Sequence, residues 1–332
     1  MTTKTVKVAM LSFAHQHAIG YAMVLNALPD VEITVIADED ADRGQHWAQT
    51  FNTQWVASID EALAMDVDCV VVCSENVHHK TMTIAAAKAG KHVLCEKPLA
   101  TTVDDATSMI AACEEAGVQL MTAFPVRFNA SILALKDAVH SEHFGETLTI
   151  AARNPGTNPG QWFVDPALSG GGAVIDHTVH VVDVLRFIYG AEVTEVYAQS
   201  GNKLAGGVSD DTGLLMFKLS NGVPVSLDTS WTRPSNWPIW GGVTLDVIGE
   251  FGVLFANAYN NNYDLAETTT PSYTWQPVEH TGDPEMVSAF IDAVRNGTDV
   301  PVTGTDGLRA LEVALAAMKS AESNQLEPIT HA

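Results

Sequence analysis

The first 123 residues alternate short apolar runs with segments of helical periodicity. The apolar runs have the length of strands, and the segments between them carry apolar residues three or four positions apart, as amphipathic helices do. The predicted strands are Val6–Leu11, Glu32–Ala37, Cys69–Cys73, His92–Cys95 and Gln119–Ala123, and the predicted helices are Ala18–Leu28, Asp40–Phe51, His78–Ala89 and Thr102–Ala116. Repeated strand–helix units with short connections predict an α/β domain built on a doubly wound parallel sheet.

After residue 123 the chain changes to segments in which apolar and polar residues alternate, which is typical of strands with one buried face. The predicted strands are Leu148–Ala152, Val193–Gln199, Gly213–Leu219, Val223–Thr229 and Thr244–Ile248. A long apolar helix, Ala173–Tyr189, and an amphipathic final helix, Thr305–Ser320, accompany them. The sequence therefore predicts two domains, 1–123 and 124–332. The second is an α+β domain with a largely antiparallel sheet, and its final helix is available to pack back on the first.

The net charge and the cysteines indicate what kind of partner the protein binds and in which compartment it is expected. The 332 residues include 17 basic and 40 acidic side chains, a net charge of −23. This charge repels phosphate backbones and anionic lipid, so we expect a small-molecule partner and neither a nucleic acid nor a membrane. The chain shows no signal-peptide pattern and no apolar stretch of membrane-spanning length. Four cysteines with no zinc-site spacing predict buried free thiols, so we expect a cytoplasmic protein; they are Cys69, Cys73, Cys95 and Cys113.

The end of the second predicted strand carries an acid, Asp38, where a Rossmann-type dinucleotide site needs one for the ribose. The turn after the first strand does not read GxGxxG; it runs Ser-Phe-Ala-His-Gln-His from Ser12 to His17. From the residues alone, Asp38 is equally well explained as a helix N-cap. As a coenzyme contact it would favour NAD over NADP, because a carboxylate repels a 2′-phosphate, and no arginine follows it before Arg43.

Five segments in order along the chain resemble the motifs of one enzyme family. They are Ser74–His79 (TPNxxH, with Glu75 in place of proline), His92–Leu99 (GKHVxxEKPLA), Ala123–Asn129 (RFNP), Gly170–Asp183 (GGGxxxDxxxHxxD) and Gly304–Ala310, the start of the last helix. These are motifs of the Gfo/Idh/MocA oxidoreductases, which are NAD(P)-dependent dehydrogenases and reductases of sugars, inositols and related polyols. The resemblance covers nearly the whole chain.

The resemblance implies a coenzyme site along the first domain. The implied contacts are Ser12, Phe13, Ala14, His15, Gln16, Asp38, Ser74, Glu75, Asn76, His79, Glu96, Lys97 and Arg127. The three glycines of the family align with Ser12, Ala14 and His17. Without them, we expect His15 or Gln16 to contact the pyrophosphate through side chains as well as amides.

The helix 173–189 carries a polar stripe on an otherwise apolar surface. Asp176, His180 and Asp183 are spaced four and three apart, so at about 100° per residue they lie within one stripe. Buried polar groups need partners. A bracing Asp–His pair and a catalytic pair, in which the acid orients a general base, both satisfy this requirement. The resemblance favours catalysis, with His180 as base and Asp176 orienting the base or the substrate.

Lys97 follows the predicted strand 92–95, at the sheet edge where ligands bind. By resemblance it bonds the reacting hydroxyl, although an ordinary surface lysine fits the residues too. His177 either lines the pocket or packs the helix. A zinc site from Asp176, His177 and His180 is a further alternative, but Asp176 and His177 should point to different faces, and we expect no metal. Among the loop tryptophans we favour Trp162 for stacking on a sugar.

Together these observations predict an NAD-dependent oxidoreductase. It would transfer hydride between a secondary alcohol of a sugar or cyclic polyol and the nicotinamide, with Lys97, Trp162, Asp176, His177 and His180 at the substrate. Two alternatives stay open: a non-redox enzyme that cleaves glycosides by transient oxidation on tightly held NAD, and a non-catalytic sugar- or nucleotide-binding protein. The exposed face expected on the second sheet predicts a homodimer or homotetramer.

Overall fold

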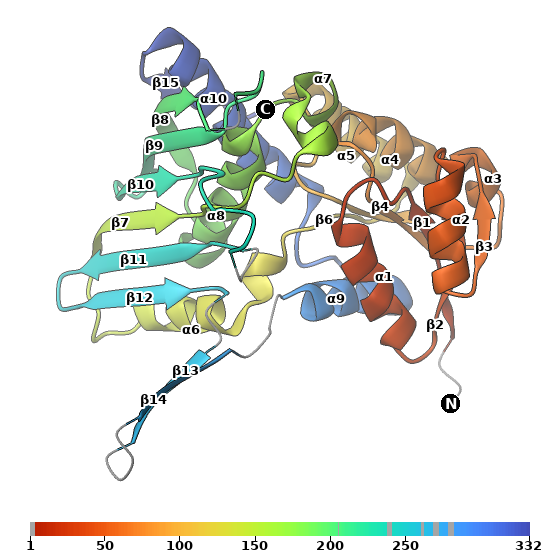
Figure 1. Cartoon of the computed structure of the whole chain (residues 1–332), viewed down its shortest axis with the longest axis horizontal. Helices are drawn as coiled ribbons and strands as arrows, with labels where there is room; N and C mark the ends of the chain where they lie inside the picture. The colour runs from red at the N-terminus through yellow and green to blue at the C-terminus, as the bar shows by residue number, and fades with distance from the viewer. Residues whose placement is uncertain (1–3, 205, 238–240, 260–261, 268–271, 278–281) are drawn as a thin grey trace.

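Two sheets organise the protein, seen in a computed structural model of the whole chain (Figure 1). The structure describes residues 4–204, 206–237, 241–259, 262–267, 272–277 and 282–332. The first sheet contains six parallel strands: β1 (Val6–Leu11), β2 (Val31–Ala37), β3 (Gln54–Val56), β4 (Cys69–Val72), β5 (His92–Cys95) and β6 (Leu120–Thr122). Their order, β3-β2-β1-β4-β5-β6, is that of a doubly wound dinucleotide-binding fold. The prediction for the first half is confirmed.

Helices cover both faces of this sheet, as a parallel sheet requires. They are α1 (His17–Ala27), α2 (Ala41–Thr50), α3 (Ile59–Leu63), α4 (His79–Lys88) and α5 (Val103–Ala116), with a short 3-10 helix η1 (Asn76–His78) before α4. Strand β4 is buried at every position because it lies at the centre of the sheet. The four cysteines are free thiols and all are buried, as predicted. Burial raises the pKa of each thiol, Cys113 to about 11.

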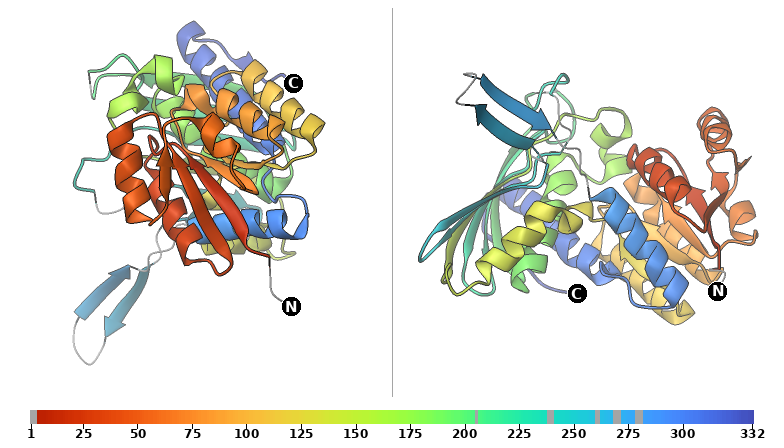
Figure 2. Two further views of the ribbon diagram at one scale, coloured as in Figure 1. Left: turned by 90° about the vertical axis from the view of Figure 1, so that its right-hand side faces the viewer. Right: turned by 90° about the horizontal axis from the view of Figure 1, so that it is seen from below.

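The second sheet has seven strands in the order β12-β11-β7-β10-β9-β8-β15. They are β7 (Thr147–Arg153), β8 (Val193–Gly201), β9 (Thr212–Leu219), β10 (Pro224–Asp228), β11 (Thr244–Gly249), β12 (Val253–Asn257) and β15 (Glu327–Pro328). Only the pair β7–β10 is parallel among these neighbours, so the sheet is largely antiparallel, as predicted. A separate hairpin, β13 (Asn262–Glu267) with β14 (Ser272–Pro277), projects from the body (Figures 1 and 2).

The remaining helices lie between the two sheets or along their border (Figure 2, right). They are η2 (Pro125–Phe128), α6 (Ala130–Val139), η3 (Gln161–Val164), α7 (Pro166–Ser169), α8 (Ala173–Tyr189), α9 (Asp283–Asn296) and α10 (Gly304–Ser323). Helix α8 is almost wholly buried, which explains why its surface is apolar apart from the polar stripe of Asp176, His180 and Asp183. Helix α10 packs against α8 and β8 and also against α5 and β6, so the end of the chain returns to the first sheet.

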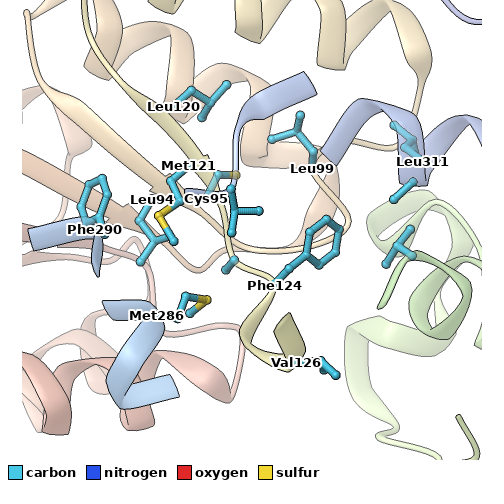
Figure 3. Packing of buried hydrophobic residues seen from close by; sticks show 14 of the residues in the cluster. Leu94, Cys95, Leu99, Leu120, Met121, Phe124, Val126, Met286, Phe290 and Leu311 are labelled. Carbon is cyan, nitrogen blue, oxygen red and sulfur yellow. The ribbon is translucent and has the colours of Figure 1, made fainter. Parts of the chain in front are cut away.

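The junction between the two halves is a continuous apolar core (Figure 3). Phe124, which follows β6, is fully buried, and Phe290 of α9 is buried among the same cluster. Burying a side chain of this size contributes about 1.5–3 kcal/mol. The core therefore holds the two sheets in a fixed relation, and residues from both can meet in one site.

Among the described residues, no helix has both the length and the apolar character that crossing a membrane demands.

Candidate active site

Lys97 and Asp176 form an ion pair between the two halves of the protein. Lys97 stands just past the carboxyl end of β5, and Asp176 lies in the first turn of α8. The Lys97 Nζ donates to Asp176 Oδ1 at 2.5 Å, and both side chains are largely buried. A buried ion pair stands only with good geometry and further hydrogen bonds. The predicted catalytic lysine and aspartate are therefore brought together.

The second carboxylate oxygen of Asp176 faces two more donors. Trp231 Nε1 donates to Asp176 Oδ2 at 3.3 Å, and His177 Nε2 lies 3.3 Å from the same oxygen. Burial alone would raise the pKa of Asp176, but Lys97 and His177 outweigh it and hold the pKa well below its usual value. The expectation that Asp176 and His177 point to different faces is wrong. The side chain of His177 turns toward the carboxylate of Asp176, although the two residues are neighbours on the helix.

His180 lies one helical turn beyond Asp176, packed edge-on against Phe124 at a centroid distance of 6.0 Å. Its Nδ1 is buried and has no hydrogen-bond partner within the described chain. Burial, and then the charge of Lys97, lower the pKa of His180 well below 6.5. The imidazole is thus neutral at pH 7 and able to accept a proton. Asp176 accepts from Lys97 and Trp231 and lies against His177. In the described chain it makes no hydrogen bond to His180.

The turn after β1 replaces the missing glycines by side-chain bonding. Ser12 takes the left-handed conformation, with φ 71°, that a glycine ordinarily supplies. The backbone N–H groups along the turn are bonded internally: Phe13 to Asp38 Oδ2, Ala14 to Ser12 Oγ, and His15 to the Cys73 carbonyl. A pyrophosphate oxygen would therefore have to take the place of the Ser12 hydroxyl to reach the Ala14 N–H. Gln16 is exposed at the start of α1.

The imidazole of His15 is turned inward, with 1% of its side chain exposed. Its Nδ1 accepts the backbone N–H of His17, and Trp162 and Phe163 lie against its ring. The bond to His17 holds the ring in the interior, and the expected side-chain contact from His15 to the pyrophosphate stays a prediction.

His17, at the third glycine position, fits because its ring reaches a buried acid. His17 Nδ1 lies 3.0 Å from Glu96 Oε1, and the Tyr21 hydroxyl donates to the same oxygen at 2.5 Å. Burial would raise the pKa of Glu96, but the neighbouring histidines His15 and His17 and the nearby Lys97 lower it far below its usual value. Glu96 therefore carries a buried charge that His17, Tyr21 and the Lys97 backbone N–H stabilise.

His15, His17 and Glu96 are close enough to hold a metal ion, with their ligand atoms within 4.8 Å of one another. The bond from His17 to His15 Nδ1 argues against such a site. It leaves the proton of neutral His15 on Nε2, which is the atom that would have to bind the metal. We assign no metal to this cluster.

The loop after β4 lies beside the second half of the chain. Asn76 Nδ2 donates to the Ser169 carbonyl at 2.8 Å, while Asn76 Oδ1 is buried without a partner in the described structure. His79 is buried between the carbonyls of Pro98 and Ser74. Nearly all buried polar atoms have a partner, so Asn76 Oδ1 is available to accept a hydrogen bond from a ligand or a water at this edge.

Trp162 connects the second half to the turn after β1. Its indole Nε1 donates to the Ala14 carbonyl at 3.1 Å, and its ring stacks on Phe163. The ring is buried, with Ala173 and Trp231 in the same cluster. The structure therefore shows Trp162 as a contact between the halves, and its stacking on a sugar stays a prediction. Trp237 is exposed, and Trp240 falls outside the described residues.

Comparison with known proteins decides the family. Residues 13–124 match the family model of oxidoreductases with an NAD-binding Rossmann fold, GFO/IDH/MocA, and residues 132–255 match the GFO/IDH/MocA C-terminal domain. Myo-inositol 2-dehydrogenase of Thermotoga maritima is 30% identical over 325 residues, 92% of this chain and 93% of the relative. The protein is a member of the GFO/IDH/MocA family. The resemblance stated from its motifs is confirmed.

Two further relatives support this placement in the GFO/IDH/MocA family. The 1,5-anhydro-D-fructose reductase of Ensifer adhaerens is 29% identical over 308 residues, covering 90% of this chain and 91% of the relative. The crystal structure of GenD2 from gentamicin A biosynthesis, solved with NAD, superposes with a TM-score of 0.90 at 25% identity, covering 99% of this chain and 98% of that one. The family model that matches residues 13–124 is that of an NAD-binding Rossmann fold, so NAD is the coenzyme of this GFO/IDH/MocA protein.

Arg127, a residue of a GFO/IDH/MocA motif, is bound by two carboxylates from α8 and α10. Arg127 of the RFNP-like segment bonds Asp183 with its Nε and Nη2 at 2.5–3.0 Å, and its Nη2 also reaches Asp306 at 3.1 Å. These bonds join η2, α8 and α10 in the interior. The Arg127 guanidinium is occupied by two carboxylates, and its expected coenzyme contact stays a prediction.

Sequence reasoning missed Trp231 as a site residue of this GFO/IDH/MocA protein. It comes three residues after β10 and is buried, with its N–H on the carboxylate of Asp176. Its position just past a strand end was the one available signal. Trp162 and Trp231 both lie in Pro/Gly-rich sequence, so the sequence pattern alone did not separate them.

Proposed function

We propose that the protein is an NAD-dependent oxidoreductase acting on a secondary alcohol of a sugar or cyclic polyol. The observation that carries the proposal is the ion pair of Lys97 with Asp176, placed beside a neutral His180 whose Nδ1 has no hydrogen-bond partner among the described residues. Proton acceptor and ammonium stand together at the carboxyl edge of a dinucleotide-binding sheet, where ligands bind. The relatives named as an inositol dehydrogenase and an anhydrofructose reductase support the substrate class.

In this proposal each side chain has one task at the reacting hydroxyl. His180 takes up the hydroxyl proton at the nitrogen facing the substrate, and a neutral imidazole is ready to do so. The Lys97 ammonium donates to the same oxygen and stabilises the negative charge that develops there. Asp176 holds the ammonium in place, and Trp231 and His177 hold Asp176. NAD, when bound, supplies the hydride acceptor.

The first half supplies the residues that would hold NAD. Ser12, Phe13, Ala14 and Gln16 line the turn at the N-terminus of α1, where a helix end favours phosphate. Ser74, Glu75 and Asn76 follow β4, and Asn76 Oδ1, which has no hydrogen-bond partner in the described part of the chain, would accept from a ribose hydroxyl. His79 and Glu96 lie beneath this edge and act by positioning it.

A substrate panel tests the proposed reaction. The protein is incubated with NAD and a set of sugars, inositols and anhydro sugars, and NADH absorbance is followed. Sustained NADH formation with at least one of them supports the proposal. Substrate loss without NADH accumulation would indicate the non-redox alternative with recycled NAD. NADH binding without turnover of any panel member, in either direction, would favour a binding protein.

We further propose a homodimer or homotetramer, in which the second sheet pairs with that of another copy. The helices α8 and α10 lie on one face of this sheet, and in the described chain the views show none on the other (Figure 2, right). That outer face carries six exposed apolar side chains on four strands: Tyr197, Leu214, Met216, Ile248, Val253 and Phe255. Monomeric proteins rarely leave such a surface in water. We place the assembly in the cytoplasm, where buried free thiols are ordinary.

Charged substitutions on this face should separate the copies. The double variant Met216→Lys/Phe255→Glu changes two side chains that are 62% and 77% exposed, so the fold of one copy should tolerate it. We expect light scattering to give a dimer or tetramer for the wild type and a monomer for the variant. Met23→Lys, at an equally exposed methionine of α1 (62%), is the matched control and should assemble like the wild type. A monomeric wild type at micromolar concentration would rule the proposal out.

A further inference from the structure

A short segment of the second half, residues 161–169, reaches across to the first half. It consists of η3 and α7, and we call it the strap (Figure 1). Near its start, the Trp162 indole N–H donates to the Ala14 carbonyl at 3.1 Å. At its end, the Ser169 carbonyl accepts from Asn76 Nδ2 at 2.8 Å. The strap is therefore bonded to the first half close to both of its ends.

Two aromatic rings of the strap lie against the turn after β1. The His15 ring is 5.1 Å from the Phe163 ring and 5.8 Å from the Trp162 ring, measured between centroids. Trp162 and Phe163 are each 8% exposed. Detaching the strap from the turn would expose part of this apolar surface to water, which costs free energy. We therefore expect the attached form to dominate.

The end of the strap is packed against a third segment of the first half. Gly170, the next residue, has a φ of 79°, and a Cβ there would stand 2.7 Å from Thr101 Cγ2, between β5 and α5. Of the residues that the strap and Gly170 meet, Ala14 comes after β1, Asn76 after β4 and Thr101 after β5. These three strands are neighbours in the sheet. The strap thus runs along the carboxyl edge of the first sheet.

A dinucleotide bound to such a sheet lies along the same edge, with its diphosphate at the N-terminus of the helix after the first strand. The sheet is on one side of the coenzyme, and the strap would cover it on the other. Two glycines with left-handed backbone flank the strap, Gly160 with φ 66° and Gly170. Small residues at the ends of a loop commonly act as its hinges. The strap can therefore swing as a unit once its contacts with the first half are broken.

We propose that the strap is a gate for the coenzyme, latched on the turn after β1 by Trp162 and Phe163, and that its detachment limits how fast NAD enters and NADH leaves. Opening of a loop of this kind sets the turnover rate of many enzymes. The inference rests on the coenzyme site and is independent of the proposed substrate.

The kinetics of NADH binding test the gate without any substrate. Stopped-flow mixing of protein with NADH gives the association rate constant from coenzyme fluorescence, and a chase with excess NAD gives the dissociation rate constant. Trp162→Phe keeps an aromatic ring but loses the N–H bond to Ala14. That bond joins two protein groups, so its loss should speed entry and release alike, each by about three- to tenfold. The dissociation constant should change much less than either rate constant.

Phe163→Leu loosens the latch at a second point. It removes the ring contact with His15 and keeps an apolar side chain, so the fold should tolerate it. We expect both rate constants to rise again, and the double variant with Trp162→Phe to be the fastest. Trp237→Phe makes the same change at a tryptophan that is 49% exposed and lies outside the strap. It is the matched control and should leave both rate constants unchanged, and thermal melts establish that each variant is folded.

The gate is overturned if folded Trp162→Phe and Phe163→Leu both keep the wild-type rate constants. It is equally overturned if release alone becomes faster and the dissociation constant rises in proportion, because the two rings would then bind the coenzyme directly. Absence of NADH binding by the wild type would contradict the gate and the coenzyme assignment together. Failure on the substrate panel, with NADH kinetics as expected, would count only against the proposed reaction.

Discussion

His180→Ala should lower kcat by about 10²–10⁴-fold, the usual contribution of a positioned general acid–base group. The affinity for NADH should stay near the wild-type value, because α8 belongs to the substrate side of the site and the coenzyme turn makes its contacts elsewhere. The measurement is steady-state kinetics on a substrate from the panel, with NADH titration for the binding arm. His143→Ala, at an exposed loop histidine, is the control and should keep full activity.

Lys97→Ala and Asp176→Asn should lower kcat as well, and their losses should be far from additive with that of His180→Ala. Asp176 acts by holding the Lys97 ammonium, so once Lys97 is gone the charge on Asp176 has little left to position. All variants are checked by thermal melts, because these side chains are buried. If folded His180→Ala and Lys97→Ala both retain near-wild-type kcat, the cluster only braces the core.

Arg127→Met should lower the free energy of unfolding by about 3–5 kcal/mol, the cost of leaving a buried charge without its partner. The side chain of Asp183 is 0% exposed, and Arg127 provides its bidentate contact. The measurement is denaturant unfolding near neutral pH. The double variant Arg127→Met/Asp183→Asn removes the stranded carboxylate, and it should recover a large part of the loss.

The same variant has a defined pH dependence. Burial raises the pKa of Asp183 to about 6, against the opposing pull of Arg127. Without Arg127 that pKa rises further, so Asp183 in the variant is protonated at mildly acid pH and its burial then costs less. The difference in stability between variant and wild type should therefore shrink as pH falls from about 8 to about 5.5. An Arg127→Met protein as stable as the wild type at about pH 8 would show that the ion pair contributes nothing.

The hydrophobic pattern predicted best those helices and strands that are buried along most of their length. Strand β5 and helix α8 were predicted at their observed bounds, because β5 is covered on both faces and α8 is closed by glycine on each side. Strand β3 and helix α9 were not predicted. β3 has three residues, too few for a period. Helix α9 does carry a local signal, because Met286, Val287, Phe290 and Ile291 repeat at helical spacing before Gly297, and the sequence analysis missed it.

The sequence predicted which residues belong to the site better than it predicted which of them touch. Asp176 and His180 follow from helical spacing, and Lys97 follows from its place after β5. That Lys97 bonds Asp176, that His15 turns inward, and that Arg43 reaches Asp38 depend on side-chain directions fixed by tertiary packing. Gly44 is the clearest case, since its lack of a side chain matters only once Trp55 lies above it.

The ion pair of Lys97 and Asp176 joins side chains that come from the two halves of the protein. Lys97 follows β5 of the first sheet, Asp176 lies in α8, and the apolar core beneath them is continuous. Neither half therefore carries the proposed proton-transfer groups alone. The fixed relation between the halves, which the shared core provides, is itself a condition for the chemistry.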